Sequence, residues 1–219
     1  MAASAQTIID QIRHDVGAAM LSRLNSHGFS EITPDHLAED TSHDVAVIRR
    51  IFPDLSAAVD QGLKDIDDAV SAGLQDDFAE DAEATTRERI LEGLIVRFEA
   101  YVPFKHAIRN LNKAAAMNPP LALMMVGRLS GASQALLEIS GLDTSGLKGL
   151  MRVKGLAAVA LSVQRDWLAD DSADLSVTIR ALDKRLGQAE SLAETLNIIS
   201  RDHDASDHAT TKDDGREDQ

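Results

Sequence analysis

The sequence contains no cysteine among its 219 residues, and aromatic residues make up only 3% of it. The absence of cysteine excludes a disulfide framework, a zinc–thiolate site and a thiol nucleophile. No apolar run approaches the roughly 20 residues that a transmembrane helix needs, and the first residues lack the basic segment and apolar core of a secretory signal. We therefore expect a cytoplasmic protein without integral membrane association.

Alternation of β-branched and polar residues, the pattern of half-buried strands, is nearly absent. The numbers of glycine and proline residues, 13 and 5, are modest, and long stretches consist of Ala, Leu, Asp, Glu, Arg and Ile. These residue types favour helices over strands. The sequence therefore predicts an all-α fold.

The net charge is −14, and it is spread unevenly. Residues 60–99 carry four Lys and Arg against twelve Asp and Glu, whereas residues 100–160 carry seven against two. An acidic surface repels polyanions and counts against tight nucleic-acid binding, which usually depends on a basic face.

The N-terminal part shows the pattern of three helices. Apolar residues recur at every fourth position of residues 8–24, which predicts an amphipathic helix of about five turns. Thr33 can cap a short second helix over residues 34–39. Asp44 can cap a third helix that ends at Phe52, because a proline follows and the residue before proline avoids the helical region.

The remaining sequence predicts a larger helical body. The acidic run of residues 76–83 is typical of a solvated loop or helix end. Residues 147–168 are apolar over most of the helix circumference, which predicts a central, buried helix. The expected helices cover residues 55–74, 86–101, 105–116, 121–139, 147–168 and 172–196.

Residues 24–59, LNSHGFSEITPDHLAEDTSHDVAVIRRIFPDLSAAV, resemble the helix-turn-helix region of the TetR family of transcriptional regulators. The shared features are a glycine turn, a threonine-led second helix with an LA pair, a capped third helix and an immediate fourth helix. The resemblance implies a TetR-like fold with a helix-turn-helix module over residues 1–53. It also implies a helical ligand-binding and dimerisation domain over residues 54–200, while residues 201–219 are expected to form a disordered acidic tail.

A second resemblance covers residues 146–186, GLKGLMRVKGLAAVALSVQRDWLADDSADLSVTIRALDKRL. This segment is similar to TetR-like bacterial proteins related to the lipid-binding accessory proteins of ubiquinone (coenzyme Q) biosynthesis. The shared elements are Trp167, the acidic pair and serine that follow it, and the LDKRL block. Residues 87–111 resemble the same group.

In TetR-like proteins the third helix enters the major groove of DNA and nearby residues contact phosphates. The resemblance implies DNA contacts by Thr33, Val45, Val47, Arg49 and Arg50. Arg49 replaces the tyrosine usual in the family, Leu55 replaces a phosphate-contacting lysine, and valine offers no hydrogen bond to a base edge. We therefore expect weakened DNA contacts, with a purely stabilising module as the alternative.

The body has candidates for a ligand pocket and for a dimer interface. Methionine and aromatic residues at helical spacing favour an ordinary core by pattern alone, but the resemblance implies a pocket for a small apolar effector or lipid. Its candidate lining residues are Phe98, Tyr101, Met117, Leu121, Met124, Met125 and Trp167. The apolar stripe of the last helix, with its mixed-charge polar face, favours homodimerisation or intrachain packing over membrane binding. The candidate interface residues are Ile179, Leu182, Leu186 and Leu196.

We find no spacing that indicates catalysis, and we expect neither a metal nor a cofactor. The His and Asp residues at positions 203–208 are interpreted as a solvated part of the tail. Two hypotheses follow. The first is a TetR-like regulator that binds a DNA operator and is controlled by an apolar effector. The second is a lipid- or isoprenoid-binding accessory protein without DNA binding.

Overall fold

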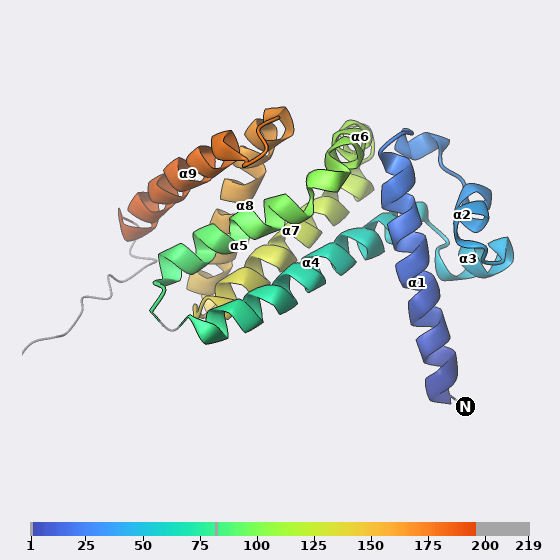
Figure 1. Cartoon of the computed structure of the whole chain (residues 1–219), viewed down its shortest axis with the longest axis horizontal. Helices are drawn as coiled ribbons and strands as arrows, with labels where there is room; N and C mark the ends of the chain where they lie inside the picture. The colour runs from blue at the N-terminus through green and yellow to red at the C-terminus, as the bar shows by residue number, and fades with distance from the viewer. Residues whose placement is uncertain (1, 82, 196–219) are drawn as a thin grey trace, which may run out of the picture.

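The computed structural model describes residues 2–81 and 83–195, and these form nine α-helices, two short 3-10 turns and no β-strand (Figure 1). The prediction of an all-α fold is confirmed. The helices are α1 (Ala2–Leu24), α2 (Pro34–Thr41), α3 (Val45–Ile51), α4 (Leu55–Glu80), α5 (Thr86–Ala100), α6 (Lys105–Ala115), α7 (Pro119–Ile139), α8 (Gly146–Ala169) and α9 (Ser176–Thr195), with 3-10 turns at Phe29–Glu31 and Val102–Phe104.

Helices α1 to α3 form a module at one end of the molecule, on the right in Figure 1. The Thr33 hydroxyl accepts a hydrogen bond from the backbone N–H of His36 at 3.3 Å, and an Asp44 carboxylate oxygen accepts one from Ala46 at 2.6 Å. Both capping residues therefore start the helices that the sequence assigned to them. Leu37 of α2 and Ile48 of α3 have no exposed surface, which fixes the two short helices on the core of the module.

The module is joined to the body by the crossing of α1 and α4. A methyl group on Gly62 of α4 would lie only 2.5 Å from the backbone oxygen of Gly17 in α1. The two helix backbones therefore touch at a point where neither position has room for a side chain.

Helix α4 is longer than the sequence indicated. We expected it to end near Leu74 and the acidic run of residues 76–83 to form a solvated loop or helix end, but α4 continues to Glu80, so most of the run is the end of this helix. Leu74 and Phe78 explain the correction, because they keep the four-residue period and are 2% and 6% exposed. The guanidinium of Arg89 also lies 5.5 Å from the centroid of the Phe78 ring, which anchors the last turn.

In the body, α7 and α8 lie behind α4 and α5 in Figure 1, and α9 packs mainly on α8. The prediction that α8 is a central, buried helix is correct for only one of its faces. One face of α8 is in the core through residues such as Val153, Val163 and Trp167, but Leu147 is 73% exposed on the opposite face. The apolar composition of α8 thus provides two different surfaces, only one of which is used within the chain.

Asp170 holds the corner between α8 and α9. Its carboxylate is 2% exposed and accepts hydrogen bonds from the backbone N–H and hydroxyl of Thr178 at 2.8 and 2.7 Å, as well as from Ser172. Burial alone would raise the pKa of Asp170, but these hydrogen bonds outweigh it and lower the pKa well below its ordinary value. Asp170, the first residue of the acidic pair that follows Trp167, is therefore a structural element of this corner.

Candidate DNA-reading surface and ligand pocket

Helix α3 presents a short outward face. Ile48 points into the module, whereas Arg49 and Arg50 are exposed and Val47 is 39% exposed. Val45 is half-buried at the first turn, next to the capping Asp44. Thr33 is exposed at the start of α2. The candidate DNA-contacting residues therefore lie on the outside of the module, on two neighbouring helix starts and one helix face.

Most cations of this module are already paired with carboxylates. Arg49 donates to Asp35 of α2 at 2.8 Å, and Arg23 of α1 donates to Asp40 at 2.9 Å. Arg13 lies 3.3 Å from Asp10 on the same helix. Arg50 makes no hydrogen bond or ion pair within the described residues. About one arginine per module is thus left without a carboxylate partner and can attract a DNA phosphate.

A pocket with a volume of about 190 Å³ lies between α5, α6, α7 and α8. Four of the seven candidate ligand-binding residues line it: Phe98, Tyr101, Met125 and Trp167. Further lining residues include Leu129 and, missed by the sequence reasoning, Arg97, Ile108, Asn112, Arg128, Leu161 and Gln164. The missed signal was the spacing of Arg97 and Tyr101, four residues apart and therefore on one face of α5.

Three candidates lie elsewhere. Met117 is 88% exposed, because it lies in the turn between α6 and α7 after the α6 helix has ended. Leu121 has no exposed surface and belongs to the core rather than to the pocket wall, and Met124 packs half-buried against the same core. The structure therefore excludes these three residues from the lining of this pocket.

The two arginines of the pocket are both neutralised. The Arg97 Nε donates to Asp67 at 2.8 Å, and the Tyr101 hydroxyl lies 3.1 Å from the same carboxylate oxygen. Arg128 makes two parallel hydrogen bonds to Asp60, at 2.9 and 3.0 Å. Burial disfavours the charged form of Arg97, but the Asp67 carboxylate outweighs burial and raises the Arg97 pKa. Burial and Asp67 raise the pKa of Tyr101, so the phenol stays protonated.

Trp167 forms part of the pocket wall and is only 1% exposed. Its ring centroid is 5.4 Å from that of Phe98, and the Lys105 ammonium lies 5.3 Å from its ring. The indole N–H has no hydrogen-bond partner within residues 2–81 and 83–195. A buried donor without a partner costs about 1–3 kcal/mol, so this N–H is an unsatisfied polar group of the core.

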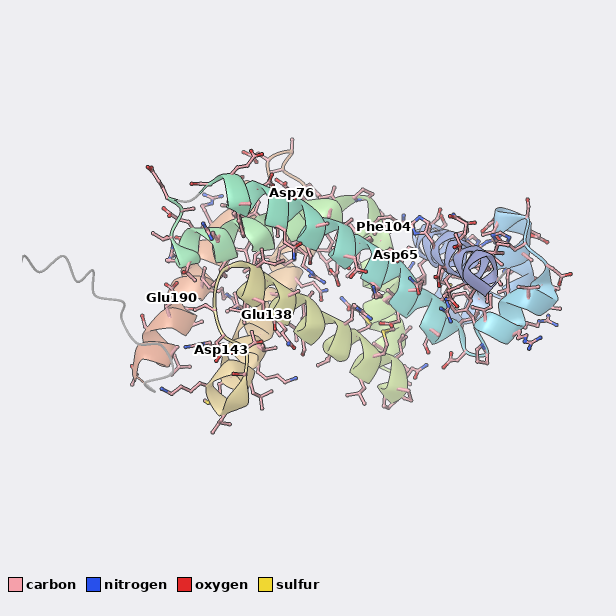
Figure 2. All side chains as sticks on the ribbon, turned by 90° about the horizontal axis from the view of Figure 1, so that it is seen from below. Asp65, Asp76, Phe104, Glu138, Asp143 and Glu190 are labelled. Atoms are coloured by element: carbon pink, nitrogen blue, oxygen red, sulfur yellow. The ribbon has the colours of Figure 1, made fainter. Side chains whose placement is uncertain are left out.

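A second, more open groove runs between α1, α4 and α5 and has a volume of about 480 Å³. Asp65 and Phe104, both labelled in Figure 2, belong to its lining, and His14 of α1 lies 3.0 Å from Asp65 of α4 at its rim. The groove borders the junction between the module and the body. No local pattern in the sequence indicates this groove, because its residues come mainly from three separate helices.

The candidate dimer interface on α9 requires a correction. Leu182 and Leu186 are 0% and 5% exposed because they pack inside the same chain, and Ile179 is half-buried. Leu196 lies outside the described residues, as do the tail and its His and Asp residues. The apolar stripe of α9 is therefore used within the chain and has little surface left for a second subunit.

The unused apolar surface is on α7 and α8 instead. We call it the α7–α8 face, and its exposed apolar residues are Leu123, Val126, Leu147, Leu150, Met151 and Leu161. The Lys154 ammonium of α8 donates to the Ser130 hydroxyl of α7 at 3.2 Å, so the exposed stripes of the two helices adjoin. Gly127 and Gly131 lie in the same stripe of α7, and a methyl group on either would meet no atom within 4 Å.

The described residues show neither a membrane-spanning helix nor a metal-binding cluster. These contain no helix long and apolar enough to cross a membrane. They also contain no group of three or more His, Asp or Glu side chains that could hold a metal ion.

The arrangement of a three-helix module on a larger helical body is similar to that of a solved structure, a TetR transcriptional regulator from Rhodococcus sp. RHA1. The two structures agree with a TM-score of 0.53 at 14% sequence identity, over 83% of this chain and 97% of that chain. No protein-family model matches the sequence, and no curated protein matches it. The chain therefore has the all-α TetR-type fold, and the likeness concerns the fold alone.

Proposed function

We propose that this protein is a TetR-like transcriptional regulator that binds DNA weakly as a homodimer and responds to a small apolar ligand. The observation that carries the proposal is the outward face of α3, where Val47, Arg49 and Arg50 project from a helix fixed by Ile48 and capped by Asp44. In a helix-turn-helix, a capped and exposed helix in the position of α3 fits into the major groove of DNA. The TetR-type fold supports the same conclusion, and the proposal includes a cytoplasmic location.

Selection of bound sequences from a random DNA library at low salt tests the DNA-binding part. The proposal expects an enriched palindrome with half-sites one helical turn apart, because two symmetric modules read two half-sites. The double variant Arg49→Ala/Arg50→Ala should bind more weakly, and its affinity should depend less steeply on salt. Recovery of no enriched palindrome would contradict DNA recognition.

The α7–α8 face supports the homodimer. Helices α7 and α8 have 21 and 24 residues, which corresponds to lengths of about 32–36 Å at about 1.5 Å per residue. With each of the two helices about 8–10 Å wide, the face covers about 500–700 Å² on each partner. The total of about 1,000–1,400 Å² reaches the lower end of the range of specific, stable interfaces.

The position of this face also suits a regulator. In Figure 2 the helix-turn-helix module lies at the right end and α7 lies along the lower side of the body. A two-fold axis running along that side would keep both modules at the same end. Gly127 and Gly131 favour close contact, because glycine lowers helix stability by about 1 kcal/mol relative to alanine and the chain itself does not need the space.

A second candidate function is favoured by the paired cations of the module. Because Arg13, Arg23 and Arg49 are bound to carboxylates, the alternative is a ligand-binding accessory protein without DNA binding. The resemblance of residues 146–186 to the accessory proteins of ubiquinone biosynthesis supports a lipid or isoprenoid as its ligand. Native mass spectrometry of the gently purified protein tests this candidate, which expects a co-purified isoprenoid or phospholipid together with failure of the DNA selection.

A further inference from the structure

We propose that the groove between α1, α4 and α5 is a second binding site, which takes a hydrophobic cation such as a quaternary ammonium or phosphonium ion. The groove shares no lining residue with the pocket between α5, α6, α7 and α8, so this inference depends neither on that pocket nor on DNA binding. Three properties of the groove carry it: its size, its apolar walls and its carboxylates without a lysine or arginine partner.

The groove is large enough for a small molecule and has apolar walls. Its volume of about 480 Å³ lies within the range of about 300–1,000 Å³ that holds drug-sized ligands. Ile66 and Val70 of α4 and Val96 of α5 line it and are only half-buried, so they present apolar surface to an occupant. Gly73 also lines it, and a methyl group there would meet no atom within 4 Å. Covering these walls favours a ligand with apolar groups.

The charge of the groove is negative. Its lining includes Asp65 and Asp77 but no lysine or arginine. The Asp65 carboxylate is contacted by the Gln61 amide at 2.7 Å and by the His14 ring at 3.0 Å, and His14 is the only lining residue that can gain a positive charge. Asp77 is exposed, and its carboxylate has no hydrogen bond or ion pair within the described residues. The two carboxylates are therefore available to a cation.

The cations nearest in sequence to the lining residues are engaged elsewhere. Arg13 and Lys64 each form an ion pair with an aspartate one turn away on their own helix. Arg97 donates to the buried Asp67 at 2.8 Å, and the Lys105 ammonium donates to the backbone at the corner between α8 and α9. None of them lines the groove, so none compensates its two carboxylates.

These properties together select a hydrophobic cation. An anion would be repelled by both carboxylates, and a compact, strongly hydrated cation would gain nothing from the apolar walls. A cation whose charge is surrounded by apolar groups uses both features. The ring of Phe104, which lies near Asp65 in Figure 2 and lines the same groove, can add a cation–π contact.

Two probe ions separate the charge from the apolar surface. Tetraphenylphosphonium and tetraphenylborate carry the same four phenyl groups around a centre of opposite charge. Calorimetry at about pH 8, where imidazole is generally uncharged, measures the affinity of both ions. We expect the phosphonium to bind at least about tenfold more tightly than the borate, because each partly exposed carboxylate attracts one ion and repels the other.

Three variants locate the bound cation. The double variant Asp65→Asn/Asp77→Asn keeps the shape of the groove and should bind the phosphonium about four- to twentyfold more weakly. Asp76→Asn/Asp171→Asn is the matched control, because it removes two exposed carboxylates that do not line the groove, and it should leave the affinity nearly unchanged. Gly73→Leu should fill part of the groove and weaken the binding of both ions.

The possible outcomes decide the proposal independently of the regulator. Equal affinity of the wild type for the two ions, or equal losses in the two double variants, would overturn the selection of a cation by these carboxylates. Phosphonium binding that persists in both Asp65→Asn/Asp77→Asn and Gly73→Leu would place the cation elsewhere. Binding of neither ion would overturn the site, and dissociation of the proposed homodimer by Gly73→Leu would then assign the groove to a second copy of the chain.

Discussion

Arg49 of α3 is held by Asp35 of α2 at a distance of 2.8 Å, across the turn of the helix-turn-helix. Both side chains are more than half exposed, so the pair is a surface ion pair that water screens. Its main consequence is functional, because a phosphate would have to compete with Asp35 for the same guanidinium. In the proposed regulator, Asp35 therefore competes with DNA phosphates for Arg49.

Replacement of Asp35 by asparagine should strengthen DNA binding. The variant frees Arg49 and removes a negative charge near the phosphates, so we expect the affinity to rise and the salt dependence to steepen by about one counterion per protomer. Fluorescence anisotropy of a labelled duplex at two salt concentrations measures both. Asp76→Asn is the matched control, since Asp76 is exposed near the opposite end of α4 (Figure 2). An equal increase in DNA affinity in the two variants would show that the effect comes from the net charge and not from the release of Arg49.

Introduction of a charge into the α7–α8 face should dissociate the proposed homodimer. Leu150 is 52% exposed in the single chain, and Leu150→Glu would place an unpaired carboxylate in the interface. We expect the dimer dissociation constant to rise at least about tenfold, because an unpaired buried charge costs more than about 1.4 kcal/mol. Sedimentation velocity measures the change.

The control for this interface is Leu192→Glu on α9, where the replaced side chain is 61% exposed. It should leave the dimer intact. Dissociation by Leu192→Glu but not by Leu150→Glu would place the interface on α9. A wild type that stays monomeric and floats with anionic vesicles would assign the α7–α8 face to a lipid surface instead.

Asp170 should make the stability of the protein sensitive to acid. Asp170→Asn removes the charge and keeps one of the two acceptor oxygens, so about one charge-assisted hydrogen bond to Ser172 or Thr178 is lost, and we expect a loss of about 1.5–3 kcal/mol at pH 7. The pKa of Asp170 is lower in the folded chain than its ordinary value of 3.8. Its contribution is therefore fully present above pH 3.8 and is lost as the pH falls through the folded-state pKa.

Urea unfolding at a series of pH values between 7 and 2.5 measures this contribution. The difference between wild type and Asp170→Asn should be constant at neutral pH and should shrink below about pH 3.8. Asp171→Asn changes the neighbouring, exposed carboxylate and should have little effect at any of these pH values. A difference that does not depend on pH would assign the loss to packing rather than to the charge.

The crossing of α1 and α4 should tolerate no side chain at Gly62. Gly62→Ala would place a methyl group 2.5 Å from the Gly17 oxygen, so the helices must separate, and we expect a loss of about 1–3 kcal/mol. Gly73→Ala is the matched control on the same helix, because a methyl group there meets no atom within 4 Å. It should stabilise the protein by about 0.5–1 kcal/mol. Thermal unfolding compares the two variants, and equal effects would contradict a backbone contact at Gly62.

Local signals in the sequence were sufficient for much of the fold. The caps at Thr33 and Asp44 and the four-residue periods predicted the helices of the module, because capping and amphipathic patterning act within one or two turns. The length of α4 was predicted too short, because Phe78 lies within a dense run of acidic residues that is typical of a solvated segment. The burial of Phe78 depends on Arg89 and the rest of the body, which are distant in sequence.

The candidate pocket was predicted only in part. Phe98 and Trp167 could be selected as large aromatic residues on helix faces, but Met117 has the same composition signal and lies in an exposed turn. The compensation of Arg97 by Asp67 joins residues 30 positions apart on two helices. No local pattern contains that information.

By itself, the sequence determined that the chain is helical, where its first helices begin, and which stripe of each helix is apolar, because these properties depend on neighbouring residues. The tertiary structure decided what each apolar stripe contacts: the stripe of α9 packs within the chain, while α8 keeps Leu147 and Leu150 at the surface. It also decided that Arg49 is bound by Asp35 and that the Trp167 N–H is not bound within the described part of the chain. A periodic pattern specifies that a face is to be buried, but only the packing of distant segments specifies against what.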